Sequence, residues 1–321
     1  MSSLAQRWCH ALLVAGATLL ATSAFAQMEL KIVAPAAPGG GWDQTARSIQ
    51  QALMEEKLVK SAQVVNIAGA GGTVGLAQFV NSAKGDGNQL MVNGFVMVGA
   101  ILVNKSPVSL SQVTPIARLT EETQVMVVPT NSPIKNAKDL AEAVKKDVAK
   151  VTFAGGSAGG VDHIMAALFI GAVGGDASKA NYIPFSGGGE SLAAILGGKV
   201  TAGISGYGEY EGQIKAGKLR AIGVTSPKRL PGVDVPTFRE QGVDLVLTNW
   251  RSVVAAPGIT DAQKKALADL VDKLAKSKTW NDILKQKGWD AAYLPGDAFV
   301  KFLGDEQTRV GNVLKSVGLV K

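Results

Sequence analysis

Cysteine and histidine are almost absent from this 321-residue sequence, which contains only Cys9, His10 and His163. Cys9 and His10 lie in an N-terminal segment that has the features of a cleaved leader. The remaining chain then has no thiol, so it can form no disulfide and offers no thiolate nucleophile or metal ligand. One histidine without cysteine does not make a typical zinc site, and the carboxylates show no clustered spacing. We therefore expect neither a metal nor another cofactor.

Long hydrophobic runs are also lacking, because no apolar run reaches the roughly 20 residues that a membrane-spanning helix needs. The apolar stretch Ala11–Leu20 follows Arg7 and precedes the small-x-small signal Ala24-Phe-Ala26. This arrangement is typical of a secretory signal peptide cleaved after Ala26. Cys9 precedes the apolar stretch, so it cannot be the lipid acceptor of a lipoprotein. We expect a soluble exported protein that comprises residues 27–321.

Aromatic residues make up 6% of the sequence, and the formal net charge is +7. From Asp261 to the end of the chain, basic and acidic residues are interleaved, as on a solvated helical surface. A nucleic-acid-binding protein shows a basic stripe instead. We therefore expect no nucleic-acid partner. The positive excess could help to attract small anions, although net charge alone says little about a site.

Short apolar runs alternate along the chain with segments of helical periodicity. Strands that alternate with helices predict largely parallel sheets covered by helices, joined by right-handed crossovers. The length and pattern predict two α/β lobes without a flexible tether between them. The expected strands are Leu30–Ala34, Val64–Ile67, Leu90–Val92, Val125–Val128, Val151–Phe153, Tyr182–Phe185, Val200–Ile204, Leu219–Val224 and Val253–Ala256.

Four predicted strands end in a glycine-rich turn that precedes a helix. We call Pro38–Asp43 the first turn, Ala68–Thr73 the second, Gly155–Gly160 the third and Ser186–Glu190 the fourth. Glycine lets a ligand approach the backbone, and a helix start presents unpaired N–H groups that favour an anion. In parallel sheets such turns meet at the carboxyl ends of the strands. No turn has the spacing of a dinucleotide or phosphate loop.

The third turn contains Gly-x-Ser-x-Gly around Ser157, which is the pattern of a hydrolase nucleophile elbow. Such an enzyme needs a histidine far along the chain, whereas His163 lies only six residues after the serine. We therefore expect no enzyme. Ser157 is either a helix N-cap or a hydroxyl that faces a bound anion, and the two roles are compatible. His163 either satisfies a backbone group or contacts a ligand carboxylate.

Several other side chains near the turns have open roles. Asp43 and Asp162 lie in first helical turns, where the helix dipole favours an acid, so we interpret both as structural. Arg47 is interpreted as a surface residue. Trp42 is expected to form a pocket wall because its neighbours are glycines, and Tyr207 is either a pocket wall or a filler of the turn that contains it.

Five segments resemble those of one known family, the binding proteins of tripartite tricarboxylate transporters, also called the Bug or TctC family. The glycine–tryptophan–aspartate segment Ala34–Arg47 resembles the family's first signature, and Gly69–Gly75 resembles its second. Phe153–His163 resembles the glycine–serine turn followed by histidine. Gly217–Ser226 and Val235–Gly242 resemble further blocks. The resemblance runs over nearly all of the chain after Ala26, in the family's order.

The resemblance implies a type II periplasmic binding protein fold, in which two α/β lobes close on a ligand. It places lobe 1 at residues 27–123 with 251–321 and lobe 2 at residues 124–250. It implies a monomeric periplasmic protein that delivers a small carboxylate to the transporter's membrane subunits. The expected ligand-binding residues, with the two aromatic candidates included, are Pro38, Gly39, Gly40, Gly41, Trp42, Ala70, Gly71, Ser157, Gly159, His163, Gly187, Gly188 and Tyr207.

The sequence departs from the family's amino-acid-binding members in one respect. Many of those members carry an aspartate near the end of the strand at 200–204, whereas Gly203–Gly208 contains none. The resemblance therefore favours a tricarboxylate such as citrate or a C4 dicarboxylate over an amino acid. Citrate is the less favourable of the two because its three negative charges would have no obvious cationic side chain as a partner. Two other functions stay open: a sensor that presents its ligand to a signalling receptor, and a secreted hydrolase that uses Ser157.

Overall fold

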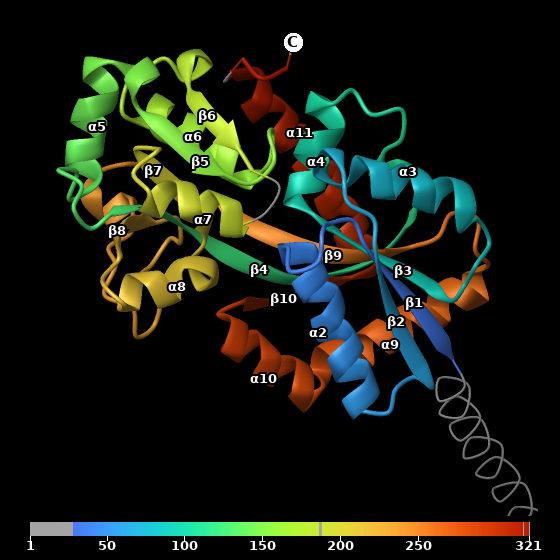
Figure 1. The fold of residues 1–321 in the computed structure, drawn as a ribbon. Coiled ribbons are helices and arrows are strands. Elements are labelled where there is room, and N and C mark those ends of the chain that lie inside the picture. The colour runs from blue at the N-terminus through green and yellow to red at the C-terminus, as the bar shows by residue number, and fades with distance from the viewer. Residues whose placement is uncertain (1–27, 186–187, 317, 321) are drawn as a thin grey trace, which may run out of the picture.

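The computed structural model describes residues 28–185, 188–316 and 318–320, so the predicted signal peptide and Gly187 lie outside the described residues. Strands and helices form two groups that lie side by side (Figure 1). Two strands, β4 and β9, run through the middle of the molecule in this view. Within the described part of the chain, no helix has both the length and the apolar character to cross a membrane.

The first sheet contains the N-terminal strands. β1 lies between β2 and β3 and pairs with both in parallel, while β9 pairs antiparallel with β3 and with the first half of β4. β10 lies antiparallel to the same half of β4. The strands are β1 (Glu29–Ala34), β2 (Ser61–Asn66), β3 (Gln89–Gly94), β4 (Thr114–Pro129), β9 (Thr248–Ala255) and β10 (Asp290–Pro295).

The second sheet contains the middle strands and the second half of β4. β5 (Thr152–Gly155) pairs in parallel with β6 (Asn181–Pro184) and β7 (Ala202–Gly206). β4 pairs antiparallel with β7 and with β8 (Leu219–Val224). The expectation of largely parallel sheets is therefore wrong in part. The chain crosses between the groups along β4 and returns to the first group before β9, so the strands next to β4 run against it.

Strand β4 is the link between the two sheets. Its pairing with β9 ends at Thr123, and its pairing with β7 begins at Gln124. The returning chain is tied to this point, because the Thr225 N–H donates to the Gln124 carbonyl and the Leu247 N–H donates to the Thr225 carbonyl. Both connections are thus held by backbone hydrogen bonds rather than forming a loose tether.

The helices cover the faces of both sheets, as the periodicity predicts. Each amphipathic helix packs its apolar stripe against a sheet, which removes that surface from water. α4 is apolar all round because it packs against α6 of the other group as well as against α11. The helices are α2 (Gly41–Glu55), α3 (Thr73–Ser82), α4 (Phe95–Val103), α5 (Ala137–Lys146), α6 (Val161–Ala172), α7 (Gly188–Leu196), α8 (Tyr207–Lys215), α9 (Asp261–Lys276), α10 (Lys278–Lys287) and α11 (Gly296–Ser316).

Candidate functional site

A cavity of about 570 Å³, here called the central cavity, lies where the first, second and third turns meet. Residues of both groups line it, including the ends of β7 and the start of α8. Its lining residues are Pro35, Ala36, Ala37, Gly39, Gly40, Gly41, Trp42, Gln44, Ala68, Gly69, Ala70, Gly71, Gly72, Val96, Gln124, Gly155, Gly156, Ser157, Val161, Asp162, Phe185, Ser191, Leu192, Ile204, Ser205, Gly206, Glu209, Tyr210, Asn249 and Arg251.

The first turn is held in place by a carboxylate from the helix that follows it. The Gly39 N–H donates to Asp43 Oδ2 at 2.7 Å, and Asp43 also accepts from Arg47 Nε at 3.0 Å and from Asn66 Nδ2 at 2.8 Å. Burial raises the pKa of Asp43, but these hydrogen bonds outweigh it, so the pKa lies below its ordinary value. The structural interpretation of Asp43 agrees with these contacts.

The second turn depends on glycine. Gly71 and Gly72 have φ values of 62° and 90°, in the left-handed region that side chains disfavour. A Cβ on Gly72 would also lie 2.5 Å from the ring of Trp42. Trp42 is 8% exposed and lines the central cavity. The expectation that this ring forms a pocket wall is therefore matched by its position.

The third turn is held by a carboxylate in the same way as the first. The Gly156 N–H donates to Asp162 Oδ2 at 2.7 Å, and the Tyr182 hydroxyl donates to the Gly156 carbonyl at 2.8 Å. Burial raises the pKa of Asp162 to about 7; the bond from Gly156 offsets part of this, whereas Glu209 and Glu122 add to it. Asp162 has no ion pair among the described residues.

Ser157 lines the central cavity, but it does not cap a helix. α6 begins at Val161, and its N-cap residue is Gly160, which has no side-chain cap. The N-cap interpretation of Ser157 is therefore wrong, because the turn continues for three residues beyond the serine before the helix starts. The position in the cavity lining is the one expected for a hydroxyl that faces a ligand.

His163 is engaged away from the lining of the central cavity. Its Nδ1 accepts the Gly159 N–H at 3.1 Å, and its ring stacks on Tyr182 with centroids 4.2 Å apart. Burial lowers the pKa of His163 to about 4, so the ring is neutral at neutral pH. Of the two roles that the sequence left open for His163, these contacts agree with the one in which it satisfies a backbone group.

The structure brings seven of the predicted site residues together in the central cavity. These are Gly39, Gly40, Gly41, Trp42, Ala70, Gly71 and Ser157. Four others lie outside the described lining, and for them ligand contact stays a prediction: Pro38, Gly159, His163 and Tyr207. For Gly188, at the start of α7, ligand contact also stays a prediction. Tyr207 is 9% exposed and packs in the core of the second group. Gly159 instead touches α4, where a Cβ on Gly99 would overlap its carbonyl oxygen.

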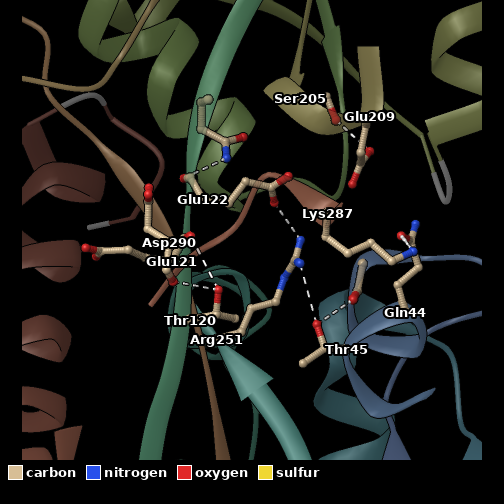
Figure 2. A network of polar contacts seen from close by, with 12 residues as sticks. Gln44, Thr45, Thr120, Glu121, Glu122, Ser205, Glu209, Arg251, Lys287 and Asp290 are labelled. Atoms are coloured by element: carbon tan, nitrogen blue, oxygen red, sulfur yellow. Dashed lines mark hydrogen bonds and ion pairs between the residues drawn. The ribbon is translucent and has the colours of Figure 1, made fainter. Parts of the chain in front are cut away.

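Sequence reasoning missed a buried ion pair beside the central cavity. Arg251 Nη2 lies 2.8 Å from Glu122 Oε2, and both side chains are under 5% exposed (Figure 2). The guanidinium also lies over the ring of Trp289. Burial and the nearby charge of Glu209 raise the pKa of Glu122, while Arg251 acts in the opposite direction. The partners are 129 positions apart, so no local sequence signal joins them.

A second residue that was missed is Glu209, in the first turn of α8. It lines the central cavity, and one carboxylate oxygen accepts the Ser205 hydroxyl at 2.7 Å (Figure 2). The charged groups in the lining are Asp162, Glu209 and Arg251, and the last already pairs with Glu122. The described lining therefore carries an excess of negative charge.

A smaller cavity of about 290 Å³, here called the side cavity, adjoins the central one. Lys287, Glu211 and Trp289 line the side cavity only, whereas Glu209 and Arg251 line both. Lys287 Nζ lies 3.4 Å from Gln44 Oε1 (Figure 2). Neither cavity holds a metal-binding cluster, since the described histidine, cysteine and acidic residues form no group suited to a metal ion.

Comparison with known proteins identifies one family. A sequence profile described as "Tripartite tricarboxylate transporter family receptor" matches residues 45–319. A similar relative is the UPF0065 protein in the TAR-I ttuE-ttuC' intergenic region of Agrobacterium vitis. It is 30% identical over 261 residues, which are 78% of this chain and 74% of the relative.

Solved structures show the same fold. MatC from Rhodopseudomonas palustris with bound malate is 24% identical, with a TM-score of 0.76, over 89% of this chain and 99% of that one. An R. palustris protein with adipate is 22% identical, with a TM-score of 0.82, over 91% of this chain and 97% of that one. At such identities the likeness establishes the fold, with two α/β groups around a central cavity.

Proposed function

The chain belongs to the tripartite tricarboxylate transporter receptor family, whose members are periplasmic substrate-binding proteins rather than enzymes, and we propose that it binds a small carboxylate. The ligand would be delivered to the membrane subunits of such a transporter. The family resemblance expected from the sequence is thus confirmed. We also propose that residues 1–26 are a signal peptide, and that the two α/β groups are lobes that close on the ligand.

The observation that carries the proposal is the way in which helices begin at the central cavity. α2, α3 and α6 start beside it, each has a glycine N-cap, and none has a side-chain cap. In contrast, α5, α9 and α10 start elsewhere and are capped by Asn136, Thr260 and Ser277. The helix starts at the cavity therefore retain N–H groups and dipole ends that suit a carboxylate.

The energy of such contacts is sufficient for useful affinity. Micromolar binding requires about −8 kcal/mol. Each charge-assisted hydrogen bond contributes roughly 1.5–3 kcal/mol, and association costs at least ~4 kcal/mol. The bonds must therefore supply about 12 kcal/mol, which four bonds of about 3 kcal/mol or six of about 2 kcal/mol provide. Closure of the lobes would strengthen each bond because it excludes water.

The charge of the central cavity restricts the ligand. Arg251 is paired with Glu122, and Asp162 and Glu209 add negative charge. Citrate, with three carboxylates, is therefore the least suitable of the ligands expected from the sequence. The neighbours with malate and adipate support a small organic acid. One carboxylate would lie on the first and second turns, at Gly39 to Gly41 and at Ala70 and Gly71.

A thermal-shift screen followed by calorimetry tests this function. We expect the melting temperature of the mature protein to rise with at least one small carboxylate, and Ser157→Ala to weaken its binding without loss of fold. A panel of mono-, di- and tricarboxylates, hydroxy acids and amino acids that leaves the melting temperature unchanged would contradict the assignment. Ester turnover that disappears in Ser157→Ala would instead support the hydrolase alternative.

A further inference from the structure

The side of the central cavity formed by β4, β7 and the start of α8 is rich in hydrogen-bond acceptors. Glu209 and Asp162 contribute carboxylates to the lining. Gln124 is fully buried, lines the cavity, and its Oε1 has no hydrogen-bond partner among the described residues. A buried acceptor without a donor is costly. This side of the cavity therefore suits a ligand group that donates hydrogen bonds.

Glu209 differs from Glu211, the other acidic residue of α8. Glu211, two residues later in α8, pairs with Lys215 at 2.8 Å and lies outside the central cavity. Glu209 accepts one hydrogen bond from the neutral Ser205 hydroxyl and has no ion pair in the described part of the chain. One carboxylate of α8 is thus satisfied by its own helix, and the other is presented to the cavity.

The cations near Glu209 are engaged by other groups. Arg251 donates to Glu122 and stacks on Trp289. Lys287 lines the side cavity and contacts Gln44 (Figure 2). The turn amides of the opposite lobe offer donors for an anion, whereas Glu209 offers an acceptor for a cation. The two ends of the central cavity therefore differ in sign.

We propose that Glu209 is a specificity-determining residue that binds a protonated amine, so that the ligand is a carboxylate that also carries an ammonium group. The inference rests on the proposed function, because the carboxylate of the same ligand occupies the glycine turns. The ammonium group would neutralise Glu209 and donate to Gln124 Oε1. The proposal departs from the sequence-based expectation against an amino acid, which considered only the strand at 200–204 and not the helix after it.

The test compares matched acids with and without an amine. Calorimetric titrations would use L-aspartate against succinate, L-glutamate against glutarate, and 4-aminobutyrate against butyrate. We expect the wild-type protein to bind at least one amine-bearing acid tenfold or more tightly than its partner. Glu209→Gln should reduce this preference to less than threefold by weakening the amine-bearing acid alone. Glu211→Gln is the matched control and should retain the wild-type preference.

The possible failures are distinguishable. If wild-type protein binds the acids without amines as tightly as their partners, or if Glu209→Gln keeps the full preference, the role of Glu209 is overturned while the carboxylate function stands. If no acid of either series or of the wider carboxylate panel binds, the proposed function is overturned, and the inference with it. Circular dichroism and the melting temperature of each variant show that a change in affinity does not come from unfolding.

Discussion

The first and third turns are built with the same device but in different electrostatic surroundings. In each turn a glycine N–H donates at 2.7 Å to a carboxylate from the first turn of the next helix, Asp43 in one case and Asp162 in the other. Asp43 also receives hydrogen bonds from Arg47 and Asn66. Asp162 receives no cation, and Glu209 and Glu122 lie near enough to disfavour its charge.

This difference means that the carboxylate charge is balanced by neighbouring groups in the first turn but not in the third. The pKa of Asp43 is lowered and that of Asp162 is raised to about 7, although both side chains are buried. The first turn is therefore charge-balanced before any ligand arrives. The third turn belongs to a lobe that carries excess negative charge into the central cavity, which a ligand with a cationic group would relieve.

The largest effect on stability is expected from Asp43→Asn. An asparagine can keep only part of the three hydrogen bonds: if its carbonyl oxygen accepts the Gly39 N–H, its amide nitrogen faces the Asn66 amide donor, and the ion pair with Arg47 is lost. We expect the free energy of unfolding to fall by about 2–3 kcal/mol at pH 8. Urea unfolding followed by circular dichroism measures this change. A stability within error of the wild type would show that the first turn does not depend on the carboxylate charge.

The contact between the third turn and α4 offers a second test. A Cβ on Gly99 would overlap the Gly159 carbonyl oxygen, so Gly99→Ala should hold the two lobes apart. We expect ligand affinity to fall at least tenfold, which is about 1.4 kcal/mol. Gly304→Ala in α11 is the control, because a Cβ there meets nothing within 4 Å. Equal affinities of the two variants would mean that binding does not require this approach.

Asp162→Asn should change the free energy of unfolding in the opposite direction to Asp43→Asn. The asparagine carbonyl can still accept the Gly156 N–H, while the buried charge is removed. We expect stabilisation of about 1–2 kcal/mol at pH 8 and little change at pH 5, where Asp162 is already protonated. Urea unfolding at both pH values checks this. Destabilisation at pH 8 comparable to that of Asp43→Asn would show that the charges of Asp162 and Asp43 stabilise their turns equally.

The pH dependence of the wild-type protein follows from the same groups. The pKa of Asp162 is higher in the folded state than its ordinary value of 3.8, so the folded state binds this proton more tightly. The contribution of Asp162 to stability should therefore fall as the pH rises from about 4 to about 7, and the raised pKa of Glu122 acts in the same direction. The lowered pKa of His163 acts in the opposite direction, up to about pH 6.5, and the two carboxyl groups outweigh it. We expect a lower melting temperature at pH 8 than at pH 5.5, and a weaker dependence in Asp162→Asn. A melting temperature that rises across this range would contradict the assignment.

The smallest effect is expected from Arg47→Met. Arg47 is 53% exposed, so its ion pair with Asp43 is screened and should contribute less than about 1 kcal/mol. The variant should nevertheless raise the pKa of Asp43, because a cation that favours the carboxylate is removed. NMR titration of the Asp43 carboxyl carbon measures this shift. An unchanged pKa would assign the lowered value to Gly39 and Asn66 alone.

The sequence predicted the apolar parts of the strands better than their polar parts. Each of the nine expected apolar runs overlaps a strand and extends at most two residues beyond it, because burial of alternating or continuous apolar side chains is a local signal. The polar segments Thr120–Gln124 and Thr248–Arg251 were not recognised as strand, since several polar side chains there are buried against partners that are distant in the sequence. Glu122 with Arg251 and Thr225 with Gln124 are examples.

The sequence by itself determined where glycine stands at helix starts, and hence which backbone amides are open to an anion. Those positions depend on neighbours in the chain and on the absence of a capping side chain. The turns before the helices also contain glycines with positive φ, such as Gly39, Gly72 and Gly159. The tertiary structure decided which charges surround the turns. Arg47 lies one helical turn from Asp43 in sequence, whereas Glu209 meets Asp162 only because α8 and α6 begin at the same cavity. Electrostatic energy depends on distance in space and on burial, and neither is written in local sequence.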